Sequence, residues 1–168
     1  MFPFDLFVNK KIKFKKLHPE AIIPKYHSKE AAGFDFHAFI VDELNNLGKT
    51  TDQIILFPMS QAIIRTGLSV SIPKGYEIQV RPRSGLSLKK SITITNSPGT
   101  IDSDFCPPNE IKIILYNLGS APFTVKHEDR IAQGLLNPIF RAKIIEIKDI
   151  NKKDKERNRG GGFGHTGK

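Results

Sequence analysis

The chain has 168 residues, 39% of them hydrophobic and 26% charged, which is typical of a single soluble globular domain that buries a sizeable core. No stretch approaches the ~18 consecutive apolar residues that a membrane span needs, so we expect no membrane contact. The single cysteine, Cys106, excludes an internal disulfide framework and multi-thiolate metal sites, and it fits a reducing compartment.

The formal net charge of +9 lies mostly at the two ends of the chain. Residues 1–16 and 148–168 each carry a net charge of +4, which leaves +1 for residues 17–147. A duplex-binding protein concentrates basic side chains on a folded face, so this distribution disfavours a specific nucleic-acid partner. The first residues place apolar side chains before lysines and lack a small-residue cleavage site, which does not match a secretory signal. We therefore expect a cytoplasmic protein.

Between the two ends, apolar and polar side chains alternate with a period of two. This pattern predicts strands over residues 76–81, 92–95 and 111–116. Proline and glycine recur throughout and exclude long helices, and only residues 86–90 favour a short helix. The chain is thus predicted to be all-β, with many short strands arranged as a sandwich, jelly roll or barrel.

From residue 148 the alternation stops. Residues 148–159 are too polar to bury a core and predict a solvated linker, while residues 160–168 are glycine-rich around one aromatic, Phe163. Their letters match G-x-G-x-x-G and most of a Walker P-loop, but both motifs need a preceding strand and a following helix. We reject both matches. A mobile arm that wraps an anion and a disordered tail remain the two interpretations.

Three polar clusters interrupt the predicted strands, at residues 31–38, 81–87 and 96–105. The second offers a guanidinium, a hydroxyl and a backbone N–H, which together suit phosphate oxygens. In the third, Asp102 and Asp104 lie two residues apart and would face the same side of an extended chain. One could act as a base while the other pairs with an arginine; two exposed turn acids are the alternative interpretation.

Taken together in order, five segments resemble the five motifs of the trimeric deoxyuridine triphosphate nucleotidohydrolases (dUTPases). They are Ala-Gly-Phe-Asp-Phe-His-Ala from Ala32, Pro-Arg-Ser-Gly-Leu from Pro82, Asn-Ser-Pro-Gly-Thr-Ile-Asp-Ser-Asp-Phe from Asn96, Asp-Arg-Ile-Ala-Gln from Asp129 and Gly-Gly-Phe-Gly-His-Thr-Gly from Gly161. The resemblance spans about residues 12–168. Each motif alone is weak, whereas five in order are very specific.

The resemblance implies an architecture and an assembly. The fold would be a jelly-roll-like or distorted barrel of short strands, of the β-clip kind, with a flexible C-terminal arm. The chain would divide into an N-terminal extension (1–11), a dUTPase-like β domain (12–147), and a linker with a Gly-rich arm (148–168). Family members form homotrimers whose active sites are shared between chains, so the arm would order on a neighbouring subunit's site when the nucleotide binds.

The resemblance also implies the reaction, which is hydrolysis of dUTP to dUMP and pyrophosphate, lowering dUTP and supplying dUMP for thymidylate synthesis. Asp102 would orient and deprotonate a water that attacks the α-phosphorus, a role worth ~10²–10⁴ in rate. Mg²⁺ would be bound mainly by the substrate phosphates and by waters, with Asp35 in the outer shell only. The five histidines show no metal-ligand spacing and are interpreted as structural or exposed.

The remaining implied residues contact substrate. The Arg83, Ser84 and Gly85 turn would bind phosphates, a hairpin between Ile94 and Phe105 would pair with uracil, and the Phe105 ring would pack under deoxyribose and exclude UTP. Arg130 would brace an acid such as Asp104. The full predicted set of substrate-binding residues is Arg83, Ser84, Gly85, Asn96, Thr100, Ile101, Phe105, Lys112, Gln133, Arg159, Phe163 and Thr166.

The sequence departs from the family pattern at several positions. Phe105 stands where tyrosine is usual, and residues 106–109 replace a two-residue turn before Glu110. Gly134 replaces an apolar residue, and Glu128 replaces a glycine. Arg159 precedes Phe163 by one residue fewer than usual.

Two other functions remain as alternatives. A deoxycytidine triphosphate deaminase shares the fold, but the Gly-Gly-Phe-Gly arm and the Gly-Thr-Ile-Asp run disfavour it. A catalytically idle, nucleotide-binding regulatory homologue is disfavoured by the intact Asp102 and Ser84.

Overall fold

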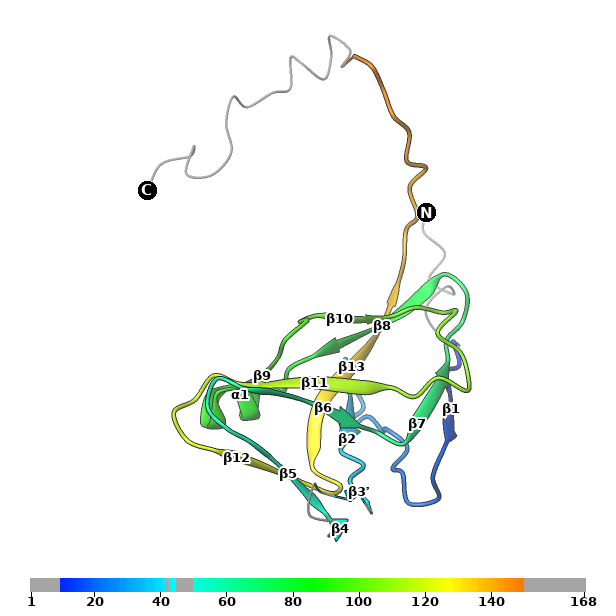
Figure 1. The fold of residues 1–168 in the computed structure, drawn as a ribbon. Coiled ribbons are helices and arrows are strands. Elements are labelled where there is room, and N and C mark those ends of the chain that lie inside the picture. The colour runs from blue at the N-terminus through cyan, green and yellow to red at the C-terminus, as the bar shows by residue number, and fades with distance from the viewer. Residues whose placement is uncertain (1–9, 42, 45–49, 150–168) are drawn as a thin grey trace.

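The computed structural model of the protein describes residues 10–41, 43–44 and 50–149. Short strands and one short helix follow one another along these residues (Figure 1). They are β1 (Lys13–Lys16), β2 (Phe34–His37), β3 (Glu43–Leu44), β4 (Thr50–Thr51), β5 (Gln53–Leu56), β6 (Gln61–Arg65), β7 (Leu68–Ser71), β8 (Tyr76–Arg81), α1 (Ser84–Lys90), β9 (Ile92–Ile94), β10 (Gly99–Ile101), β11 (Lys112–Asn117), β12 (Phe123–Lys126) and β13 (Arg130–Pro138).

The predicted all-β class is confirmed, and the three strands predicted from alternation correspond to β8, β9 and β11. In β8, Tyr76, Ile78 and Val80 are buried while the residues between them are partly exposed, as period-two patterning requires. The short predicted helix is α1, which begins two residues earlier than expected, at Ser84. No helix in the described part of the chain is long and apolar enough to cross a membrane.

The strands form several small antiparallel sheets around one large hydrophobic core, with a second, smaller cluster of Ala21, Phe39 and Leu68. A four-stranded sheet has the order β10-β8-β13-β2 and a three-stranded sheet has the order β6-β11-β9. The pairs β1-β7, β12-β5 and β3-β4 complete the described structure. This arrangement agrees with the jelly-roll-like expectation, whereas the described strands do not close into a barrel. Inward-facing side chains of the sheets form the core, among them Phe36, Ile64, Ile78, Leu115 and Ile131.

The core explains why glycine occupies position 134 in β13. A Cβ added there would lie 2.5 Å from Cε2 of Phe34 and 2.8 Å from Cε2 of Phe36. Both rings are buried and pack edge to face at a centroid separation of 5.5 Å. The two phenylalanines of β2 therefore fill the space that an apolar side chain on β13 would need.

After β13 the chain leaves the sheets. Figure 1 shows residues 139–149 running away from the body as an extended segment without a strand partner in the described structure. Four of its large apolar side chains are exposed, namely Phe140 (97%), Ile144 (95%), Ile145 and Ile147. A single copy of the chain thus leaves an apolar segment uncovered.

Candidate functional site

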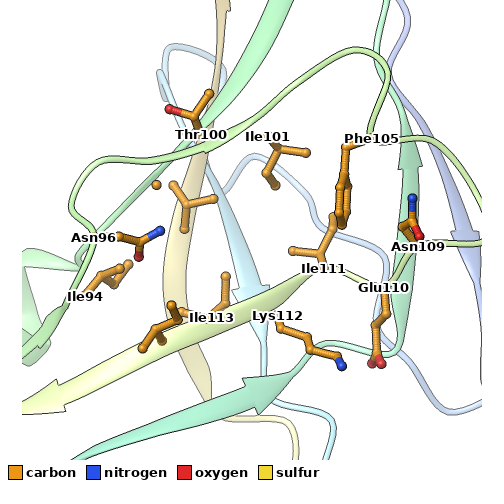
Figure 2. A pocket seen from close by; sticks show the side chains of 13 residues that line it. Ile94, Asn96, Thr100, Ile101, Phe105, Asn109, Glu110, Ile111, Lys112 and Ile113 are labelled. Carbon is orange, nitrogen blue, oxygen red and sulfur yellow. The ribbon is translucent and has the colours of Figure 1, made fainter.

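A cavity of about 460 Å³ opens between the two larger sheets, beside β10 and β11. Its walls are mostly apolar, with isoleucines from β9, β10 and β11 (Figure 2). Its polar side chains come from the connecting segments (Asn96, Asn109 and Glu110) and from β10 and β11 themselves (Thr100 and Lys112). The lining residues are Val80, Ile94, Asn96, Gly99, Thr100, Ile101, Phe105, Asn109, Glu110, Ile111, Lys112, Ile113 and Ile114. An apolar slot with a few polar groups suits a flat ring that carries polar edges.

The cavity brings together five of the predicted substrate-binding residues, namely Asn96, Thr100, Ile101, Phe105 and Lys112. Gly99 is buried beside them, and a Cβ there would lie 3.2 Å from Nδ2 of Asn96. The glycine therefore lets the Asn96 amide lie close to the β10 backbone. Figure 2 shows Asn96 and Phe105 in different parts of the lining, with Ile101 between them.

The expected hairpin between Ile94 and Phe105 is absent from the described structure. β9 pairs with β11, and β10 pairs instead with β8 in the other sheet. The chain between β9 and β10 therefore crosses from one sheet to the other. Because the two strands belong to different sheets, they form two sides of the cavity rather than one ladder.

Asp102 follows β10 directly and has an exposed side chain. The expectation that Asp102 and Asp104 lie on an extended chain is wrong, because residues 102–105 form a turn in which the Phe105 N–H donates to the Asp102 carbonyl at 3.1 Å. The turn brings Phe105 back to the cavity. Asp102 is the residue after Ile101, which is buried and lines the cavity.

The other predicted residues form a second cluster around Asp35 of β2. Arg83 donates from Nε to Asp35 Oδ1 at 3.2 Å and from Nη1 to the Arg130 carbonyl at 2.9 Å. Gln133 donates from Nε2 to the Pro82 carbonyl at 2.8 Å. Strands β2 and β13 thereby hold the turn that leads into α1, where Ser84 and Gly85 are exposed.

The partner predicted for Arg130 needs correction. Its Nη1 lies 3.3 Å from Oδ2 of Asp35, not beside Asp104. Arg130 thus pairs with an acidic side chain, as predicted, but that side chain is Asp35 of strand β2, which pairs with β13. His27 lies against the same carboxylate, with its Nε2 3.3 Å from Oδ2.

Asp35 lies among three potentially cationic groups, and its side chain is only 13% exposed. Two of these groups donate to the carboxylate, Arg83 Nε to Oδ1 at 3.2 Å and Arg130 Nη1 to Oδ2 at 3.3 Å. A carboxylate has about four acceptor positions, so Asp35 retains room for a further donor such as a water. Among the described residues, no group of three or more His, Cys, Asp or Glu side chains is placed to hold a metal ion.

His37 lies at the end of β2, and its Nδ1 is buried without a hydrogen-bond partner in the structure. Burial disfavours the imidazolium and lowers the pKa of His37 below its ordinary value of 6.5, an effect that the nearby Asp35 carboxylate opposes in part. Its neutral ring fits the interpretation of the histidines as structural residues. His127 is likewise structural, because its Nδ1 accepts the Ile40 N–H at 3.2 Å.

The predicted site residues therefore fall into two groups within one chain. None of Arg83, Ser84, Gly85, Asp35 and Gln133 lines the cavity. The three predicted residues of the arm, Arg159, Phe163 and Thr166, lie outside the described residues. Sequence reasoning did not assign Asn109 or Glu110 to the cavity; the extra residues before Glu110 were the one signal that pointed to them.

Comparisons with known proteins give a consistent result. The dUTPase family model matches residues 19–167. The deoxyuridine 5'-triphosphate nucleotidohydrolase of Nautilia profundicola is 46% identical over 158 residues, which cover 94% of this chain and 99% of that protein. The Helicobacter pylori protein of the same name is 42% identical over 158 residues, with coverage of 94% and 97%.

Solved structures resemble the fold at lower sequence identity. A mutant dUTPase from phage phi11 of Staphylococcus aureus, described with a structural Mg(II) ion, has a TM-score of 0.69 and 20% identity, covering 84% of this chain and 99% of that chain. A mutant dUTPase of Staphylococcus bacteriophage 80alpha with dUpNHpp has a TM-score of 0.70 and 22% identity, with coverage of 94% and 98%. With its ordered motifs, its jelly-roll-like sheets and relatives matched along nearly their whole length, the chain belongs to the dUTPase family.

Proposed function

We propose that this protein hydrolyses dUTP to dUMP and pyrophosphate, and so lowers dUTP and supplies dUMP for thymidylate synthesis. One observation carries the proposal: the cavity gathers Asn96, Thr100, Ile101 and Phe105 from separate segments, and Asp102 directly follows its wall. Membership of the dUTPase family supports the same reaction. The free, exposed Cys106 is compatible with a reducing compartment, and we place the enzyme in the cytoplasm.

In the proposed mechanism Asp102 is the general base. Its carboxylate accepts a proton from a water whose oxygen attacks the α-phosphorus, and the bond between that phosphorus and the bridging oxygen to the β-phosphate breaks to release pyrophosphate. A carboxylate at a turn beside a fixed strand can hold the water in line for attack. Most of the remaining rate enhancement in phosphoryl transfer comes from positioning and charge neutralisation.

Charge neutralisation is assigned to the Arg83 turn and to the substrate's metal ion. Mg²⁺ bound to the triphosphate would neutralise its oxygens, with Asp35 bonded to one of the metal-bound waters. Arg83, held by Asp35 and by the Arg130 carbonyl, presents a fixed guanidinium. Ser84 and the Gly85 N–H are exposed beside it and would donate to phosphate oxygens, while Gln133 supports the turn through Pro82.

Base and sugar selection are assigned to the cavity. The Asn96 amide and the nearby backbone would pair with the uracil edge, so that cytosine would leave buried polar groups unpaired, which can cost ~10⁴–10⁵ in kcat/KM. The Phe105 ring would pack under the deoxyribose, where a 2′-hydroxyl would lose its water without gaining a partner. Lys112 would add positive charge near the phosphates.

We further propose that the enzyme is a homotrimer with shared sites. Two observations support this assembly. The Arg83 turn does not line the cavity of its own chain, so a neighbouring subunit would supply the phosphate contacts. In addition, the apolar side chains of residues 139–149 are exposed, including Phe140 and Ile144, and large exposed apolar groups mark an interface.

The domain boundaries remain part of the proposal. Residues 12–147 would form the β domain, and residues 148–168 would carry the arm that covers the bound nucleotide. In the arm Phe163 would stack on uracil, with Arg159 and Thr166 near the γ-phosphate. An arm that orders only on a filled site of another subunit would exclude water during the reaction.

Pyrophosphate release from dUTP, dCTP, dTTP and UTP tests the function directly. We expect turnover of dUTP alone, a loss of about 10²–10⁴ in rate for Asp102→Asn, and a rate within a few-fold of the parent protein for Asp104→Asn, its exposed neighbour in the same turn. Truncation before Arg159 is expected to abolish most activity. Full activity in Asp102→Asn would refute the base assignment, and ammonia release from dCTP would show a deaminase instead.

A further inference from the structure

Strand β2, which carries Asp35, lies at the edge of the four-stranded sheet. On one side it pairs with β13, which brings Arg130 to the Asp35 carboxylate. On the other side the described structure forms a single antiparallel bridge, in which Tyr26 pairs with Phe34. The Tyr26 ring also packs edge to face on the Phe34 ring, at a centroid distance of 5.6 Å. This anchored bridge is followed directly by His27, whose side chain lies beside Asp35.

The surroundings of Nε2 of His27 indicate the direction of its hydrogen bond. The atom lies 3.3 Å from Oδ2 of Asp35 and 3.5 Å from Nη1 of Arg130. Without a proton, Nε2 would turn its lone pair toward the carboxylate, and its bond from Arg130 would lie beyond the usual hydrogen-bond length. With a proton, Nε2 donates to Oδ2 at the shorter of the two distances. We therefore assign a proton to Nε2, which makes His27 a donor to Asp35.

The two oxygens of the Asp35 carboxylate have different partners. Oδ1 accepts from Nε of Arg83 at 3.2 Å, whereas Oδ2 lies against Arg130 and His27. The χ2 angle of an aspartate is only weakly restricted by its own geometry, and the Arg130 side chain is 46% exposed. A second donor to Oδ2, carried next to a bridge on β2 itself, restricts rotation of the carboxylate. Oδ1 then stays directed at Arg83.

The direction of Oδ1 matters because Arg83 is the cation of the proposed phosphate-binding turn. Its guanidinium donates to this oxygen and to the Arg130 carbonyl. A displaced guanidinium would no longer be aligned with the phosphate oxygens whose charge it offsets. We propose that His27 is a positioning residue for the reaction, which fixes the Asp35 carboxylate and through it the Arg83 guanidinium; this inference rests on the proposed function.

Matched variants test the proposal. We would measure kcat/KM for dUTP with the parent protein, His27→Leu, His27→Gln and Lys29→Gln, a control that removes a charge from an exposed residue of the same segment. Leucine removes the donor, and the glutamine amide supplies a new one. Because the His27 side chain is 43% exposed, water replaces part of the bond, and we expect His27→Leu to lose about 3- to 10-fold. His27→Gln and Lys29→Gln are expected to stay within about two-fold of the parent.

A double-mutant cycle with Asp35→Ala separates positioning from a general structural role. Without the carboxylate His27 has no group to position, so His27→Leu is expected to change kcat/KM by less than about two-fold in the Asp35→Ala background. The same loss in both backgrounds would overturn the proposal, because His27 would then act independently of Asp35. Parent activity in His27→Leu, or equal losses in His27→Leu and His27→Gln, would also overturn it.

Two measurements without turnover distinguish this result from failure of the proposed function. Long-range ¹H–¹⁵N NMR spectra of the parent protein are expected to show a proton on Nε2 of His27, and a ring protonated at Nδ1 alone would overturn the assignment. The dissociation constant of dUpNHpp, measured by calorimetry, follows the same cycle. If the parent protein does not hydrolyse dUTP but His27→Leu weakens dUpNHpp binding by about 3- to 10-fold only when Asp35 is present, the hydrolytic function is wrong and the positioning role is supported.

Discussion

Gly134 offers a quantitative test of how β2 and β13 pack beneath the Asp35 cluster. The residue pairs with Phe34 on one side and Val80 on the other. A Cβ at this position would meet Phe34 at 2.5 and 2.8 Å and Phe36 at 2.8 Å, closer than side chains in proteins approach one another. The Phe34 ring cannot move freely, since Phe14 and Tyr26 also pack on it, at centroid distances of 5.8 and 5.6 Å.

The expected effect of Gly134→Ala follows from two opposing contributions. Overpacking of a dense core lowers the free energy of unfolding by about 1–3 kcal/mol. Alanine has less backbone entropy than glycine in the unfolded chain, which raises the same free energy by roughly 0.4–1 kcal/mol. We therefore expect the free energy of unfolding to fall by about 1–2 kcal/mol. For a chain of this size, that corresponds to a decrease in Tm of ~2–8 °C.

Thermal unfolding followed by circular dichroism measures this change, at one fixed subunit concentration because oligomers are stabilised by mass action. Gly85→Ala is the matched control, since no atom lies within 4 Å of its added Cβ and alanine favours the helix; its Tm is expected to stay or rise. Phe34→Leu is expected to relieve the clash, so that the double variant loses less than the sum of the single variants. An unchanged Tm in Gly134→Ala would refute the reasoning.

Three further predictions concern charged and titratable groups. Glu110→Ala removes the carboxylate that pairs with Nε of Arg65, and we expect urea denaturation to show a loss of about 1–3 kcal/mol; equal stability would mean that solvent screens the pair. Asp35→Asn removes the counter-charge of Arg83, so kcat/KM for dUTP is expected to fall roughly 10- to 100-fold, and a value within two-fold of the parent would contradict this role. Because burial lowers the pKa of His37 below 6.5, the unfolded state binds its proton more readily, and the free energy of unfolding is expected to decrease as the pH falls below 6.5. His37→Asn is expected to flatten this dependence in denaturation curves recorded between pH 5.5 and 8, and an unaltered slope would assign it to other groups.

Local patterning was enough to predict the strands that have one buried face. In β8 and β11 every second residue is buried. The alternation of apolar and polar residues in the sequence therefore matches the alternation of buried and exposed positions. The short helix was predictable for a similar reason, because residues 86–90 lack the proline and β-branched side chains that disfavour helices. The motif residues Asn96, Thr100, Phe105 and Lys112 are predicted from the sequence to contact substrate, and the structure adds that they line one cavity.

Pairing between distant segments was decided only by the tertiary structure. The sequence alone did not predict that Arg130 would meet Asp35, which is far from it along the chain, or that β9 and β10 would belong to different sheets. Alternation indicates which face of a strand is buried but not which strand lies beside it, since backbone hydrogen bonds are the same for any sequence. The sequence by itself determined which functional groups are available to the site. The packing of the sheets determined their positions, so that Asn109 lines the cavity and the Arg83 turn does not.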